Sequence, residues 1–172
     1  MKRSANKAMA VRAVLIFSLL TIFCLLFTAP SAQAACTQAM ATSFKQEILA
    51  GTHTSGNTYK IALYNSASAT LGASTTAYTA TGEVSGAGYT AGGATLTGFA
   101  TGSSGTTAWV DFTSDPSWAN STITADCALI YNSSVSNKAV AVFTFTSTSS
   151  TNGTFTITLP TPDASNALLR LQ

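Results

Sequence analysis

Hydrophobic and polar residues alternate along much of the chain after residue 50, a pattern typical of strands that bury one face. The segments 59–64 and 154–159 show it most clearly, because each carries large apolar side chains at every second position. The same pattern predicts further strands over 94–101, 106–113, 128–132 and 138–146. We expect the core to be anchored by Tyr59, Ile61, Leu63, Val140, Val142, Phe155 and Ile157.

One segment favours a helix. Residues 43–50 place Phe44 and Ile48 on one face, Ser43 is the expected N-cap with Gln46 three positions on, and Gly51 ends the helix. The helix is therefore predicted to be short and to dock through a single apolar stripe.

Glycine and asparagine mark the connections. Asn152-Gly153 predicts a hairpin turn between the last two strands, because both residues tolerate a positive φ. The glycine-rich segment 82–93 is expected to be a long loop that carries Tyr89 back over the sheet. Together these features predict an all-β domain with one short N-terminal helix: a single β-sandwich, Ig-like or jelly-roll-like, of about seven to nine strands.

Residues 1–34 have the three parts of a secretory signal peptide: basic residues at the start, the apolar run 13–29, and the sequence Ala32-Gln-Ala34. We expect cleavage between Ala34 and Ala35. The predicted organisation is then a signal peptide over 1–34, a flexible N-terminus over 35–41 and the β-sandwich over 42–172. An uncleaved membrane anchor and a true start at Met40 remain alternatives.

Charge and composition narrow the function classes. The whole chain carries +2, but four of its eight basic residues lie in 1–34, so the remainder carries −2. This argues against nucleic acid or an anionic membrane as partner, since both require clustered Lys and Arg. Residues 35–172 contain 45 Ser and Thr, which predicts a surface coated with hydroxyl groups.

Residue types that carry chemistry are few. His53, the single histidine, is expected to lie in a surface loop. Asp111, Asp115 and Asp126 have the residue types needed for a glycosidase pair, or, with Asn120, for a calcium site. Neither pattern has spacing specific enough to outweigh solvated turns. One His and two separated Cys exclude zinc. We therefore expect no cofactor, no metal and no enzymatic activity.

Cys36 and Cys127 leave two alternatives open. They form a disulfide worth roughly 3–5 kcal/mol, or Cys127 is a buried thiol and Cys36 lies in a frayed tail. Among the aromatic residues, Tyr78, Tyr89 and Trp109 are the candidates for a binding face, on their loop or strand-face positions alone. Trp118 is expected to pack in the core or an interface.

From Met40 onward the chain resembles a family of small structural proteins of tailed bacteriophages. The stretches that carry the resemblance span nearly all of 40–170: Met40–Gly51, Tyr59–Tyr64, Ala69–Val84, Gly88–Gly93, Ala128–Ser134, Asn137–Val142, Asn152–Ile157 and Pro160–Arg170. The resemblance implies a non-enzymatic virion protein (head decoration, fibre or tail component) and transfers no catalytic residue. The family usually begins at the sequence found here over 40–45, and usually has Gly where this chain has Cys127.

The leading expectation is thus a virion protein that acts by surface contact in several copies, with other virion proteins as partners. The alternative is an exported adhesive or carbohydrate-binding domain that contacts host-surface glycans, supported by the signal segment. A hydrolase using Asp111 and Asp115 ranks below both. The protein belongs in the virion if the resemblance holds, and outside the cytoplasm if Met1 is the true start; after signal removal it needs no membrane.

Overall fold

The computed structural model describes residues 35–161, 163 and 165–172. The expected signal peptide and Ala34 lie outside these residues, and Ala35 is the first residue described. Nine elements follow in chain order: β1 (Ala39–Met40), α2 (Thr42–Leu49), β2 (Tyr59–Tyr64), β3 (Ala94–Leu96), β4 (Phe99–Ser104), β5 (Thr107–Phe112), β6 (Ser117–Asn132), β7 (Lys138–Thr156) and β8 (Leu169–Leu171).

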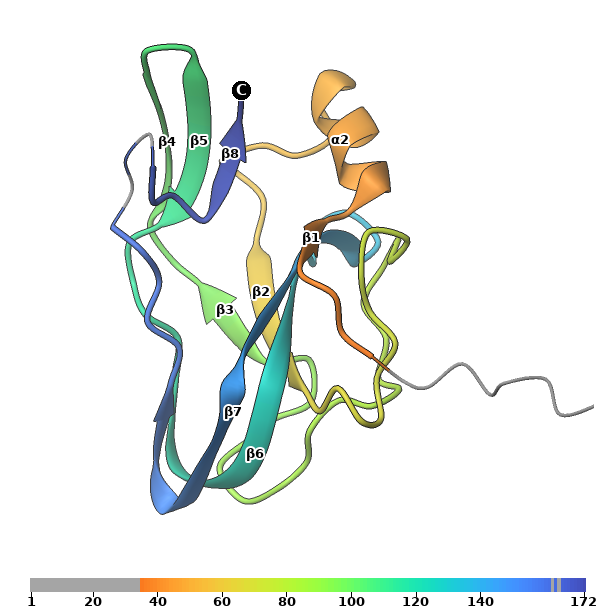
Figure 1. The fold of residues 1–172 in the computed structure, drawn as a ribbon, viewed down its shortest axis with the longest axis vertical. Helices are drawn as coiled ribbons and strands as arrows, with labels where there is room; N and C mark the ends of the chain where they lie inside the picture. Colours follow the sequence, from red (N-terminus) through yellow and green to blue (C-terminus); the bar gives the residue numbers. More distant parts are fainter. Residues whose placement is uncertain (1–34, 162, 164) are drawn as a thin grey trace, which may run out of the picture. The chain divides into compact units, whose positions relative to one another are not determined.

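Two antiparallel sheets make up the described part of the chain (Figure 1), which confirms the predicted all-β class with one helix. The larger sheet has the order β1-β7-β6-β2-β3, and the smaller has the order β4-β5-β8. A single apolar cluster contains residues from both sheets and from α2. Six of the seven expected anchors are buried in it, and Ile157 is half-buried.

The long hairpin of β6 and β7 corrects the predicted turn at Asn152-Gly153. Strand β7 runs without reversal through Asn152-Gly153, which sits opposite Ser121 in an irregular stretch of the ladder. The chain reverses instead at 133–137, where Ser136 and Asn137 have φ of 48° and 54°. Asn152 does have a positive φ, 49°, but it accommodates a bulge rather than a turn.

The strand predicted over 94–101 is divided between the two sheets. Gly98 has a φ of +70°, and a Cβ there would lie 1.8 Å from the Thr113 Oγ1 atom. Only glycine fits this bend, which ends β3 in one sheet and begins β4 in the other. Alternation alone does not reveal such a bend, because the side-chain period is the same on both sides of it.

Helix α2 begins one residue earlier than predicted. Its N-cap is Ala41, which makes no side-chain cap, and the buried Ser43 Oγ has no hydrogen-bond partner among the described residues. The Ser43 cap was therefore wrong, because the hydroxyl turns inward with the helix. Gly51 follows the helix with a φ of +69°, as expected for a C-terminal glycine.

The segment 35–41 makes backbone contacts with two other parts of the chain. The Ala35 carbonyl accepts a hydrogen bond from the Leu71 N–H, and the Thr37 N–H donates to the Leu71 carbonyl, at 3.1 and 2.9 Å. Strand β1 then pairs with Val142 and Ala141 of β7. Backbone hydrogen bonds thus join the start of the described chain to the loop around residue 71 and to the larger sheet.

Candidate functional site

The three residues of the expected binding face lie in two different places. Tyr78 and Tyr89 both point their hydroxyl groups at Glu83, which lies in the loop that follows β2. Trp109 lies on β5 in the smaller sheet. The structure therefore does not bring these three aromatic side chains together.

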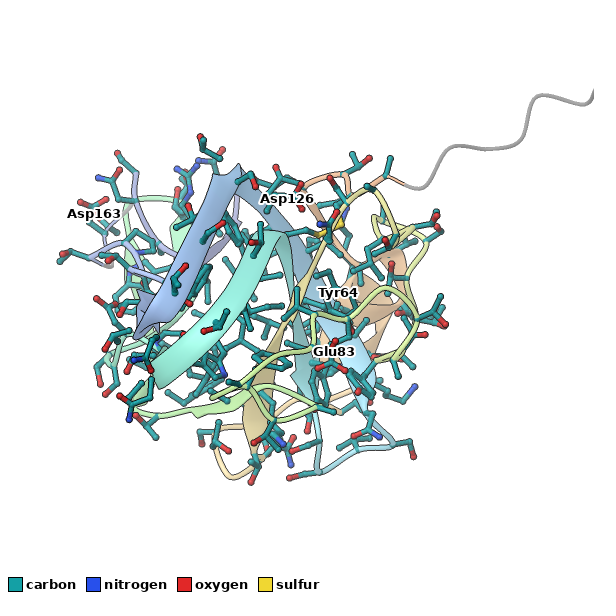
Figure 2. The ribbon with its side chains drawn as sticks, turned by 90° about the horizontal axis from the view of Figure 1, so that it is seen from below. Tyr64, Glu83, Asp126 and Asp163 are labelled. Carbon is teal, nitrogen blue, oxygen red and sulfur yellow. A yellow bond between two sulfur atoms is a disulfide. The ribbon has the colours of Figure 1, made fainter. Side chains whose placement is uncertain are left out.

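Glu83 is the centre of a tyrosine cluster. Its carboxylate accepts hydrogen bonds from Tyr78 Oη at 2.5 Å, from Tyr89 Oη at 2.7 Å and from the Gly92 N–H at 2.7 Å. Figure 2 shows Tyr64 next to Glu83. The Tyr89 oxygen also accepts the Leu63 N–H of β2, at 2.9 Å. The cluster thus fastens the glycine-rich loop over the edge of β2 that β3 leaves uncovered.

The environment of these tyrosines opposes ionisation. Burial, followed by the neighbouring Glu83 carboxylate, raises the pKa of Tyr78 to about 12. Burial raises the pKa of Tyr59 to about 12 as well, and that of Tyr64, Tyr89 and Tyr131 above the ordinary value of 10. The hydroxyl groups therefore act as neutral donors and acceptors, which suits a structural role.

A disulfide joins Cys36 to Cys127, with the two Cα atoms 6.3 Å apart. Cys127 is fully buried in β6, and Cys36 is half-buried beside Leu71. The yellow bond in Figure 2 lies close to Asp126, the residue before Cys127. The sequence left open whether the two cysteines pair, and the structure shows that they form a disulfide.

The three candidate catalytic or calcium-binding aspartates accept hydrogen bonds in three separate places. Asp111 is fully buried and accepts its neighbour's N–H, Phe112, at 2.7 Å. Asp115 accepts the Leu159 N–H at 2.8 Å. Asp126 accepts both the N–H and the hydroxyl of Ser66, at 2.7 and 2.6 Å. No group of three or more His, Cys, Asp or Glu suited to a metal ion occurs among the described residues.

His53 is buried, contrary to the expected surface position. Its side chain is 2% exposed and donates or accepts at both ring nitrogens: Nε2 lies 2.8 Å from Glu47 Oε2, and Nδ1 lies 3.1 Å from Asn132 Nδ2. The ring packs edge-on against Phe44, with centroids 4.7 Å apart. Glu47 also pairs with Lys138 at 2.5 Å. One network therefore ties α2 to both strands of the long hairpin.

The orientation of Asn132 fixes the proton on His53. Its Oδ1 accepts the Ser134 N–H at 3.1 Å, and its Nδ2 donates to Asn57 Oδ1 at 2.9 Å. The second amide hydrogen then faces His53 Nδ1, which must accept it, so the ring hydrogen sits on Nε2 and is donated to Glu47. Although burial alone would raise the pKa of Glu47, the hydrogen bonds from Lys138 and His53 lower it below its ordinary value.

Trp109 borders an apolar cavity of about 230 Å³ between α2 and the smaller sheet. The indole lies across Gly102 on the neighbouring strand, where a Cβ would be 2.2 Å from the ring. A smaller cavity of about 40 Å³ shares several walls with it and reaches His53. The cavity lining consists of Met40, Phe44, Ile48, Thr101, Gly102, Ala108, Trp109, Val110, Leu169 and Leu171.

Sequence reasoning missed the His53 network and this cavity. The histidine network joins residues up to 91 positions apart, and only the pairing of β6 with β2 brings Asn132 to the loop before β2. The alternation around Trp109 predicted the strand on which it lies, but not the position of α2 across the cavity from it.

The comparisons give no further guide. No protein-family profile, no curated protein and no solved structure matches this chain. Within the described residues, no helix has the length and apolar character needed to cross a membrane.

Proposed function

We propose that this chain is a non-enzymatic structural protein of a tailed-phage virion, a single β-sandwich that acts by surface contacts in several copies. The observation that carries the proposal is that most acidic side chains interact within the chain itself. Glu47, Glu83, Asp111 and Asp126 are each turned toward the chain's own backbone or side chains. The described residues offer a partner mainly hydroxyl groups and apolar cavities, one of which lies beside Trp109.

The resemblance of residues 40–170 to phage structural proteins supports the same proposal. Two of its most specific stretches, 128–134 and 137–142, form the paired core of β6 and β7 together with the turn that joins them. Such a family implies contacts with other virion proteins, and the apolar cavity beside Trp109 is suited to one.

The test is the protein composition of purified virions from a strain that carries the gene. We expect mass spectrometry to find this polypeptide in a fixed ratio to a major virion protein, with loss of the gene altering the particles. Its absence from particles purified to constant composition would contradict the proposal.

A second candidate is an exported adhesive or carbohydrate-binding domain, favoured by the Cys36–Cys127 disulfide. Disulfides persist mainly in oxidising compartments, and Cys36 lies upstream of Met40. The native N-terminus discriminates the two: a chain that starts at Ala35 in the culture supernatant favours export, and one that starts at Met40 removes Cys36. Glycan-array binding that is lost in Trp109→Ala would favour the carbohydrate-binding form.

A further inference from the structure

Strand β1 covers only a short part of the outer edge of β7. It is the last strand of the larger sheet on this side, and it pairs with Ala141 and Val142 of β7. Figure 1 shows β1 at one end of the long strand β7. Within the described part of the chain, no strand pairs with this edge from Phe143 onward.

The backbone groups of Thr144 point to this edge. The Ala41 N–H donates to the Val140 carbonyl at 2.9 Å, which continues the register of β1 with β7. Successive residues of a strand direct their N–H and C=O groups to alternate sides, and the pairing of β7 with β6 is regular from Ala141 to Thr144. Val142 and Thr144 therefore face the same side as Val140, and Thr144 lies just beyond the reach of β1.

This edge has few of the features by which proteins prevent strand addition. Natural edge strands are protected by charged residues, by proline, by bulges or by a covering segment. Residues 139–156 contain no charged residue and no proline, and they are rich in Thr, Val and Phe, which favour extended backbone. The ladder stays regular up to Thr144 before the next irregularity. The edge beyond β1 is thus suited to pair with a further strand.

A groove runs along the same edge. Two cavities of about 330 and 290 Å³ share Gln38, Phe143, Ala167 and Leu168, so they form one continuous groove. One wall consists of β1 and β7, and the other consists of the segments 158–160 and 167–170, which include the start of β8. A groove with a wall on each side accommodates a single extended segment rather than the edge of a folded sheet.

The lining of the groove selects apolar side chains. Phe143 and Phe145 are half-buried on one face of β7, and they line the groove with Leu159 and with Ile61 of the core. Alternate side chains of an added strand lie about 7 Å apart and would enter between these residues. Among the described residues that line the groove, Arg170 is the one that carries a charge.

The residues just before β1 do not continue along β7. The Thr37 N–H donates to the Leu71 carbonyl, and Cys36 is joined to Cys127, so this segment leaves the edge after Ala39. A strand that pairs with Thr144 therefore has to come from a more distant segment.

We infer that the edge of β7 beyond β1 takes up an extended, uncharged segment of another virion protein as an added strand, with apolar side chains at alternate positions. Backbone hydrogen bonds provide the affinity in such strand addition, and the groove provides the selectivity. The identity of the partner rests on the proposed function, whereas the edge and the groove do not.

The test uses the purified, oxidised protein and a short synthetic peptide of alternating valine and threonine, with a lysine at each end for solubility. Fluorescence anisotropy of the labelled peptide measures binding, and hydrogen exchange followed by NMR reports on the Thr144 amide. A peptide of the same sequence, N-methylated at every second amide, is the control that cannot pair.

Two variants locate the site. Thr144→Pro removes the outward N–H without removing a bond to β6, and Thr144→Val is its matched control because it keeps that N–H. Ala167→Trp fills the groove from the opposite wall, which keeps the test valid if the proline variant does not fold. Circular dichroism checks the fold of each variant.

We expect the peptide to bind and to slow exchange of the Thr144 amide at least tenfold. N-methylation, Thr144→Pro and Ala167→Trp should each weaken binding at least tenfold, and Thr144→Val less than twofold. Absence of binding at about 1 mM overturns the inference, and so does equal binding of the N-methylated peptide, which would show apolar adhesion without pairing.

A Thr144 amide that is already protected in the protein alone also overturns it. Protection that is independent of protein concentration would assign the edge to residues 1–34 of the same chain, and protection that rises with concentration would assign it to a second copy. None of these results bears on whether virions contain the protein, which the mass-spectrometric test decides separately.

Discussion

Removing the disulfide is the perturbation whose effect follows most directly from the structure. Cys36 lies in the segment 35–41, ahead of α2, and Cys127 is fully buried in β6. After reduction, the backbone hydrogen bonds to Leu71 and the pairing of β1 with β7 still hold that segment. The folded state therefore changes little, and the main effect falls on the unfolded chain.

The magnitude follows from the length of chain that the cross-link closes. The two cysteines are 91 positions apart, and the chain-entropy relation for such a loop gives about 4–5 kcal/mol at 25 °C. A single domain of this size has a total stability of about 5–15 kcal/mol. Reduction is thus expected to remove a large fraction of the free energy of unfolding, and to increase the urea dependence because the unfolded chain expands.

Urea unfolding followed by the fluorescence of Trp118, which is buried, measures this with and without dithiothreitol. The double variant Cys36→Ser, Cys127→Ala is the control and should match the reduced wild-type protein in both conditions. Loss of less than about 1 kcal/mol on reduction, with thiol titration showing two free cysteines afterwards, would refute the loop-closure reasoning. A variant that remains sensitive to dithiothreitol would show that the reductant acts elsewhere.

Three further predictions concern titratable groups. The pKa values of Tyr59 and Tyr78 are raised to about 12 in the folded state, so the stability that the neutral tyrosines provide is present in full below pH 10 and is lost as the pH rises through the folded pKa values. Absorbance at 295 nm should therefore show little tyrosinate at pH 10.5 and a cooperative rise at higher pH. Glu83→Gln leaves one acceptor for three donors and should cost about 2–4 kcal/mol in urea unfolding; an unchanged midpoint would contradict the cluster's role. Burial raises the pKa of Asp111, so its contribution is present below pH 3.8 and is lost as pH rises through the folded value. Asp111→Asn should therefore flatten the stability profile between pH 4 and 7 without lowering stability at pH 7, and a marked loss there would show that the carboxylate itself is needed.

Strand periodicity predicted the centre of the fold well. Strand β2 has the predicted bounds, and β5 differs from prediction by one residue at each end. These strands are short and straight, so a period of two carries through them without interruption. The helix was found for a similar reason, because a one-sided apolar stripe is a local signal.

Two of the wrong predictions share a physical cause. Asn152 and Gly153 have a backbone suited to a turn, but a bulge in a long strand uses the same positive φ. Only the partner strand decides between the two, and that partner, Ser121, lies some 30 residues away. The buried position of His53 likewise involves a contact with Asn132 of β6, which the pairing of β6 with β2 brings close. Long-range pairing is the information that one sequence lacks.

The structure shows how the few charged side chains of this protein are arranged. Several of its few charges are used internally, as Glu47 with Lys138 and Asp126 with Ser66 show. The surface is left with hydroxyl groups and a net charge near zero, and self-repulsion between identical copies is correspondingly weak. Weak self-repulsion is compatible with the multi-copy role that we propose for this domain.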